Sequence, residues 1–81
     1  MVMYEAGMLA RSKAGHDKAQ MYIIKEVDDT YVYLVDGRIR TLGHPKKKKK
    51  KHVQIVHGIY NMKELDDAGI RKLIKVWRKE E

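Results

Sequence analysis

The sequence predicts a small, mainly β protein, in which a barrel of about five strands is followed by one C-terminal amphipathic helix. Over the first two thirds of the chain, short runs rich in β-branched and aromatic residues alternate with turn residues, which is typical of strands joined in hairpins. The last third has the 3.6-residue apolar period of a helix. With 81 residues, the chain is expected to form one domain around a small core.

The first three strands are predicted from residue type and from the turns between them. Residues 8–12 are partly apolar and run into the polar, glycine-bearing segment 13–18, which is typical of a loop. Residues 21–27 and 31–35 are rich in β-branched and aromatic side chains, and Asp-Asp-Thr at 28–30 supplies turn residues between them. We therefore expect a strand at 8–12 and then two strands joined by a tight turn.

A second hairpin is expected at Asp36-Gly37, because a two-residue type I′ turn needs positive φ at both positions and this dipeptide tolerates it. Residues 38–42 would then form a fourth strand. Gly43-His44-Pro45 would end it, because proline cannot donate to a strand ladder. Apolar and polar side chains alternate over residues 53–55, before the apolar residue 56. This pattern predicts a fifth strand at 53–56, with a start as early as Lys51.

The C-terminal helix is predicted from an apolar stripe. Ile70, Leu73, Ile74 and Trp77 are spaced so that they fall on one face of a helix, with the basic residues of this segment on other faces. We expect this stripe to pack on the barrel as core. The alternative is a groove for a partner protein.

Two starting points are open for this helix. Asp66 or Asp67 can cap its N-terminus, and this later start is the one we expect. Asn61, with Glu64 three residues on, offers an earlier start. That start would place Gly69 inside the helix, at a cost of about 1 kcal/mol relative to alanine.

The positive charge of the chain is concentrated in one segment. The formal net charge is +7, and residues 37–57 alone carry eight Lys and Arg residues and no acid. Six of these are the consecutive lysines 46–51. Adjacent ammonium groups repel one another, so a fold is expected to keep them in a solvated loop or against a polyanion. We expect this run to be poorly ordered at its start without nucleic acid. The alternative is a loop that only favours solubility.

The same sequence gives little support for other classes of protein. It has no cysteine, which is ordinary in a reducing cytosol, and a cytoplasmic location without export or membrane insertion is expected. His44, His52 and His57 match no common zinc-ligand spacing. No metal or other cofactor is expected.

An enzyme is not expected either. Ser12 is the only serine and has no nucleophile elbow around it. The acidic pairs at 28–29 and 66–67 are adjacent in sequence, and turn formation and helix capping explain them better than acid–base catalysis. Glycine-rich loops of the type that cradle nucleotide phosphates are missing from the sequence, and no small-molecule substrate is expected.

Residues 7–18, Gly-Met-Leu-Ala-Arg-Ser-Lys-Ala-Gly-His-Asp-Lys, resemble a KOW motif, which is a strand followed by a glycine-bearing basic loop. The later segments also follow the order found in that family. They are Val35–Arg40, then His44-Pro45 with the lysine run, and then Lys51–Gln54. Residues 5–57 together resemble the small bacterial KOW-domain RNA-binding proteins, which are related to KOW-type proteins of the large ribosomal subunit in archaea and eukaryotes.

The resemblance implies an SH3-like barrel over residues 1–57. Residues 58–81 lie outside the motif, and their apolar stripe predicts a helical extension packed on the barrel. The resemblance also implies contact with ribosomal RNA or ribosomal particles, with the loop after the first strand near the nucleic acid. A monomer is expected. Two positions depart from the motif. Ala19 stands where glycine is usual, so the loop backbone is expected to differ. His16 stands where a lysine or arginine is common, which reduces the fixed charge of the loop.

The expected RNA contacts are the basic residues of the first loop and of segment 37–57. They are Arg11, Lys13, His16, Lys18, Arg38, Arg40, Lys46, Lys47, Lys48, Lys49, Lys50, Lys51 and His52. Lysines meet phosphates as point charges, whereas an arginine also forks to phosphate or stacks on a base.

The arginine and tyrosine pairs each have two interpretations. Arg38 and Arg40 would share a face of the expected fourth strand, either contacting RNA or lying on a solvated face. Tyr31 and Tyr33 also share a strand face, and half-buried sheet packing is a more common role for such a pair than stacking on bases. Two other functions stay open for the whole chain, a protein-interaction module in transcription or translation and nonspecific DNA binding.

Overall fold

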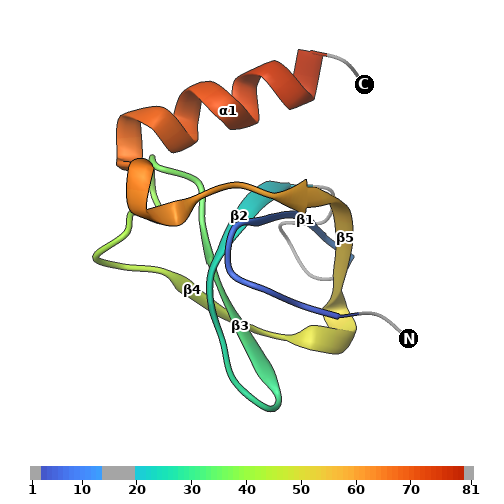
Figure 1. The fold of residues 1–81 in the computed structure, drawn as a ribbon. Helices are drawn as coiled ribbons and strands as arrows, with labels where there is room; N and C mark the ends of the chain where they lie inside the picture. Colours follow the sequence, from blue (N-terminus) through green and yellow to red (C-terminus); the bar gives the residue numbers. More distant parts are fainter. Residues whose placement is uncertain (1–2, 14–19, 80–81) are drawn as a thin grey trace.

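Over residues 3–13 and 20–79, which the computed structural model describes, five antiparallel strands curl into a half-barrel followed by one helix (Figure 1). The strands are β1 (Met8–Ser12), β2 (Met21–Val27), β3 (Tyr31–Val35), β4 (Lys46–Lys49) and β5 (Val53–Ile59). A short 3-10 helix, η1 (Lys50–His52), joins β4 to β5, and a second one, η2 (Met62–Glu64), precedes the helix α1 (Asp67–Lys79). The strand order in the sheet is β4-β3-β2-β1-β5.

The sheet is covered by apolar residues on both faces. In the register, Leu9 on β1 lies opposite Ile23 on β2, which lies opposite Val35 on β3. These three side chains form the outer core with Met21, Ile70 and Ile74. The residues that alternate with them point into the curl and form the inner core, which consists of Ala10, Tyr22, Ile24, Val32, Leu34 and Val53. Because side chains alternate between the two faces of a strand, the same strands contribute residues to both cores.

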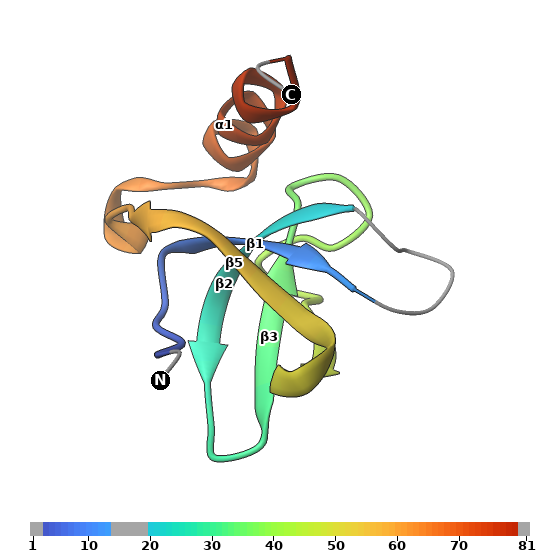
Figure 2. The ribbon, with the colours of Figure 1, turned by 90° about the vertical axis from the view of Figure 1, so that its right-hand side faces the viewer.

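The apolar stripe of α1 packs against the outer core, as predicted. Ile70 is fully buried and Ile74 is 5% exposed, while Leu73 and Trp77 are partly buried against the same cluster. The Trp77 indole Nε1–H donates to the Tyr60 hydroxyl at 2.8 Å, which ties the end of the helix to the segment after β5. Figure 2 shows the helix above the sheet, with the β2–β3 turn at the opposite end of the molecule.

Both candidate helix starts are used, by two different helices. The Asp66 Oδ1 accepts from the Gly69 N–H at 2.7 Å, so α1 has the later start that we expected. The Asn61 Oδ1 accepts from the Lys63 N–H at 3.0 Å and caps η2. The chain between them stays extended at Leu65, and Gly69 therefore lies in the first turn of α1 rather than inside a longer helix.

The predicted hairpin at Asp36-Gly37 and the predicted strand at 38–42 are wrong. The Asp36 Oδ1 accepts from the backbone N–H groups of Arg38 at 2.9 Å and Arg40 at 3.0 Å, and the Asp36 N–H donates to the Arg40 carbonyl at 2.8 Å. A local loop closed by the aspartate side chain replaces the strand ladder, which is the competition expected of Asp. Gly37 does take positive φ, at 77°.

The expected loop at the lysine run is also wrong, because residues 46–49 form β4. This strand pairs with β3 from Tyr31–Lys49 to Leu34–Lys46, and so occupies the place that we predicted for residues 38–42. Pro45 comes directly before the strand, where its missing N–H removes no ladder bond. Backbone pairing to the free side of β3 therefore outweighs the repulsion between the lysines.

The predicted turn between β2 and β3 is confirmed and is organised by one carboxylate. The Asp28 Oδ1 accepts from the backbone N–H groups of Thr30 at 2.9 Å and Tyr31 at 2.6 Å. Its Oδ2 accepts from the Tyr33 hydroxyl at 3.0 Å. Hydrogen bonds from Tyr31 and Thr30 lower the pKa of Asp28 below its ordinary 3.8, and the bond to Asp28 raises the pKa of Tyr33 above 10.0.

We expect Gly37→Ala to lower the free energy of unfolding by about 1–3 kcal/mol, measured by urea denaturation. An added Cβ would be strained at positive φ and would meet the backbone carbonyl of Asp67 in α1. Gly43→Ala is the matched control. A Cβ at Gly43 meets nothing within 4 Å, so its effect should stay below about 0.5 kcal/mol. Equal effects of the two substitutions would contradict the close approach at Gly37.

Acid should weaken the β2–β3 turn. Because the folded pKa of Asp28 lies below 3.8, its ionised form stabilises the fold above that pH, and the stabilisation disappears as pH falls through the lowered pKa. The urea concentration at the unfolding midpoint should decrease as the pH is lowered from about 5 to 2, and we expect this decrease to be smaller in Asp28→Asn than in the parent. The neighbouring Asp29→Asn removes the same charge and is the control; an equal reduction of this decrease in both variants would mean that net charge, rather than the Asp28 hydrogen bonds, is responsible.

The turn should respond to alkali with the opposite sign. The raised pKa of Tyr33 means that its stabilisation is present below pH 10.0 and disappears as pH rises through the raised pKa.

For the acid experiment, a urea midpoint that falls as steeply in Asp28→Asn as in the parent would show that the Asp28 carboxylate does not stabilise the turn.

Candidate nucleic-acid interface

The strand β4 divides the lysine run into two sets. Lys46 and Lys48 lie opposite Leu34 and Val32, whose side chains belong to the inner core, and both lysines are half-buried. Lys47 and Lys49 lie opposite Tyr33 and Tyr31 and are exposed. The alternation of a strand therefore sends every second lysine toward the curl of the half-barrel and leaves the others for solvent or a ligand.

Lys48 has a structural partner inside the half-barrel. Its Nζ donates to the Ser12 Oγ at 2.6 Å. Ser12, at the end of β1, is 1% exposed, and in the sheet order β1 is separated from β4 by two strands. This bond crosses the curl and links two strands that are not neighbours. Lys48 is thus placed to stabilise the fold rather than to meet a phosphate on the outer face.

Two lysines of the run, the exposed Lys47 and the half-buried Lys50, lie beside aromatic rings. The Lys47 Nζ lies 4.2 Å from the centroid of the Tyr31 ring, in a cation–π contact, and the Lys50 Nζ lies 5.8 Å from the centroid of the Tyr4 ring. The Tyr4 hydroxyl donates to the Lys50 carbonyl at 3.0 Å. Tyr31 and Tyr33 are half-buried, as sheet packing predicts. Tyr4 was missed because nothing in its local sequence indicates contact with a lysine 46 residues away.

A hollow of about 340 Å³ lies where β4 runs into η1. It is lined by Lys49, Lys50 and Lys51 together with Asp29 and Thr30 of the β2–β3 turn. The Lys50 N–H donates to the Thr30 carbonyl at 3.0 Å, which holds the two segments together. We call the exposed Lys47, Lys49 and Lys51, together with the half-buried Lys50, the lysine face. In both views η1 lies in the half of the molecule away from α1 (Figures 1 and 2).

The arginines of the basic segment lie elsewhere. Arg38 is exposed and Arg40 is half-buried, and both belong to the loop after β3. The expectation that they share a strand face is wrong, because the Asp36 side chain bends this segment out of the sheet. They are separated from the lysine face by the whole connection from residue 41 to residue 45.

Lys13, which follows β1, contacts the basic segment. The Lys13 N–H donates to the His52 carbonyl at 2.8 Å, and Lys13 is exposed while His52 and Arg11 are half-buried. His16, Lys18 and Ala19 lie outside the described residues. The structure therefore brings Lys13 close to η1, on the side where the resemblance places the nucleic acid.

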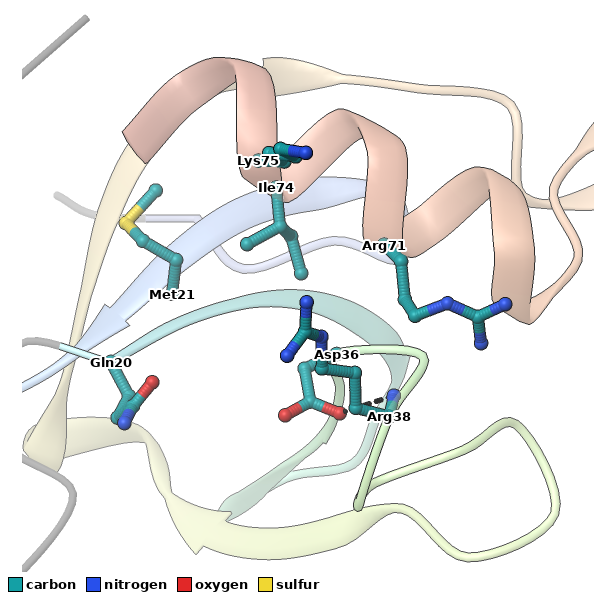
Figure 3. Close-up of a pocket in the computed structure, with 7 residues that line it drawn as sticks. All are labelled: Gln20, Met21, Asp36, Arg38, Arg71, Ile74 and Lys75. Atoms are coloured by element: carbon teal, nitrogen blue, oxygen red, sulfur yellow. Dashed lines mark hydrogen bonds between the residues drawn. The ribbon is translucent and has the colours of Figure 1, made fainter. Parts of the chain in front are cut away.

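A second group of cations was not predicted as a site. Arg38 lies with Arg71 and Lys75 of α1 around a cavity that also contains Asp36 (Figure 3). The signal in the sequence was the spacing of Arg71 and Lys75, four residues apart, which puts them on one side of a helix. The contribution of Arg38 could not be anticipated, because it depends on how the loop folds against the helix.

No protein-family model matches the chain, and no curated protein matches it in sequence. Within residues 3–13 and 20–79, no group of three or more His, Cys, Asp or Glu residues is arranged to hold a metal ion. In the same part of the chain, no helix has both the length and the apolar character to cross a bilayer.

We expect Lys48→Met to lower the free energy of unfolding by about 1.5 kcal/mol, because it removes a partly buried hydrogen bond from a charged donor to Ser12. Lys49→Met is the matched control. It removes one charge from the same run, so any relief of lysine repulsion is common to both variants, and its own effect should be small. Urea denaturation of both variants measures the difference. Equal stability of the two variants would contradict the structural role of Lys48.

Proposed function

We propose that the protein binds RNA through the lysine face. The observation that carries the proposal is the alternation of β4, which turns Lys47 and Lys49 outward, Lys47 over the Tyr31 ring, while Lys48 is held inside. With about 3.3 Å per residue in a strand, the two outward lysines are spaced about 7 Å apart along one line. Lys50 and Lys51 of η1 continue the charge beyond the strand. A linear polyanion is the ligand that such a row of cations suits.

RNA is proposed over other polyanions for two reasons. The Lys47 ammonium lies over the Tyr31 ring, and RNA would supply a partner for each: a phosphate to draw the ammonium off the ring, and an unpaired base to stack in its place. The order of segments 7–18, 35–40 and 44–54 also resembles the small bacterial KOW-domain RNA-binding proteins. Ribosomal RNA is the partner that this resemblance favours, and binding rather than catalysis is the proposed role.

The test is the salt dependence of RNA affinity, measured by fluorescence anisotropy with a single-stranded RNA. Each phosphate contact contributes about −0.7 to the slope of log affinity against log salt. With about four contacts, the parent should have a slope of roughly −3. Lys47→Gln with Lys49→Gln should flatten this slope by about 1.4 and weaken all RNAs similarly.

The matched control is Lys63→Gln with Lys72→Gln, which removes the same charge from exposed positions outside the lysine face. Its slope should stay within about 0.3 of the parental value. Equal loss in the two double variants would overturn the proposal, because net charge alone would then explain binding. Tighter binding to duplex DNA than to RNA at the same salt would overturn the choice of RNA. Cosedimentation with ribosomal particles tests the ribosomal partner.

A further inference from the structure

The cavity beside α1 has a different character from the lysine face. It has a volume of about 240 Å³ and is lined by Gln20 and Met21 at the start of β2, Asp36 and Arg38 of the loop after β3, and Arg71, Ile74 and Lys75 of α1. In Figure 3 the Arg38 guanidinium points up between the Asp36 carboxylate and Ile74. Three segments that are far apart in sequence thus enclose one site.

The apolar wall of the cavity is rigidly placed. Met21 is 3% exposed and Ile74 is 5% exposed, and both belong to the outer core. Arg71 holds the opposite wall, since its guanidinium donates to the Gly37 carbonyl at 2.5 Å. The contact between the helix and the loop therefore builds this side of the cavity.

The charges around the cavity favour an anion. Arg38 and Lys75 contribute two positive charges, against one negative charge from Asp36, while the Arg71 guanidinium points away toward the Gly37 carbonyl. The Asp36 Oδ1 is already used by two backbone N–H groups of its own loop. Arg38 and Lys75 are both exposed at the rim, so they can reach a ligand that enters from solvent.

Size and chemistry together indicate the ligand. The cavity is smaller than the range of about 300–1,000 Å³ that accommodates drug-sized molecules. One flat, largely apolar group with an attached anion suits a small apolar wall with a cationic rim. A nucleobase with its phosphate has this chemistry, and unpaired RNA bases are the ones that can leave a stack and enter a protein pocket.

We propose that this cavity receives one unpaired nucleotide of the bound RNA, with the base against Met21 and Ile74 and the phosphate at Arg38 and Lys75. The proposal rests on the proposed function and adds selectivity to it, because the lysine face meets phosphates of any sequence. The longest extent of the molecule is 28 Å, so one short RNA hairpin can reach both sites. The protein would then prefer RNA with a bulge to a continuous duplex.

The experiment compares two RNA hairpins that differ only in a single-nucleotide bulge. The parent should bind the bulged hairpin about 10-fold more tightly, which corresponds to about 1.4 kcal/mol. Arg38→Gln with Lys75→Gln should reduce this ratio to about 2-fold, because the phosphate loses both cations at the rim. The control, Lys63→Gln with Lys72→Gln, removes two charges outside the cavity and should keep the 10-fold ratio.

A second readout reports on the cavity itself. With methyl-labelled methionine, the bulged hairpin should shift the NMR signal of the Met21 methyl group, whereas the Met8 methyl, which packs with the inner core, should move little. Equal affinity for the two hairpins, or a Met21 signal that does not move, would overturn the proposal and leave RNA binding by the lysine face intact. A Met21 shift with a free nucleoside monophosphate but not with the bulged RNA would also overturn it. Failure to bind either hairpin would overturn the proposed function as well.

Discussion

Gly37 lies directly against the first turns of α1, and much of the structure depends on this contact. A Cβ at this position would meet the Asp67 carbonyl, so only glycine allows the loop after β3 to approach so closely. The contact is reinforced from both sides, because Arg71 donates to the Gly37 carbonyl and the Leu42 N–H donates to the Asp67 Oδ1 at 2.8 Å. The helix thereby covers the outer core, and the cavity beside it acquires its walls.

The same contact determines which residues pair with β3. With Gly37 and Leu42 held against the helix, the chain returns to the sheet only after Pro45. The segment that then arrives beside β3 is the lysine run, and the strand alternation sorts its charges into an inward and an outward set. A loop-to-helix contact thus fixes the arrangement of the lysine face, although it lies in the other half of the molecule.

The parts of the fold that local sequence could predict are those that local interactions decide. β1, β2 and β3 follow from residue type and turn residues, and the α1 stripe from its period, because each pattern matches the burial that tertiary packing requires. Residues 38–42 and 46–49 were misassigned for one reason. Their structure depends on contacts that are made only in the folded chain. Asp36 bonds to its own loop, Gly37 bonds to α1, and lysines 46–49 pair with the free side of β3.

The candidate site was predictable in composition but not in geometry. The concentration of positive charge identified the basic residues of segment 37–57. Charge counting treated the six lysines alike, whereas the structure gives Lys48 a hydrogen bond to Ser12 and turns Lys47 toward Tyr31. The cavity was beyond sequence analysis, because it joins Arg38 to a helix that begins about 30 residues later.

The position of β4 at the edge of the sheet has a consequence for self-association. An edge strand offers unpaired backbone groups to any other strand, and natural proteins often protect such edges with lysine. Here the edge strand is lysine throughout, so a second copy placed alongside it would bring like charges together. The residues that suit a polyanion would therefore also keep two half-barrels from joining through their β4 edges.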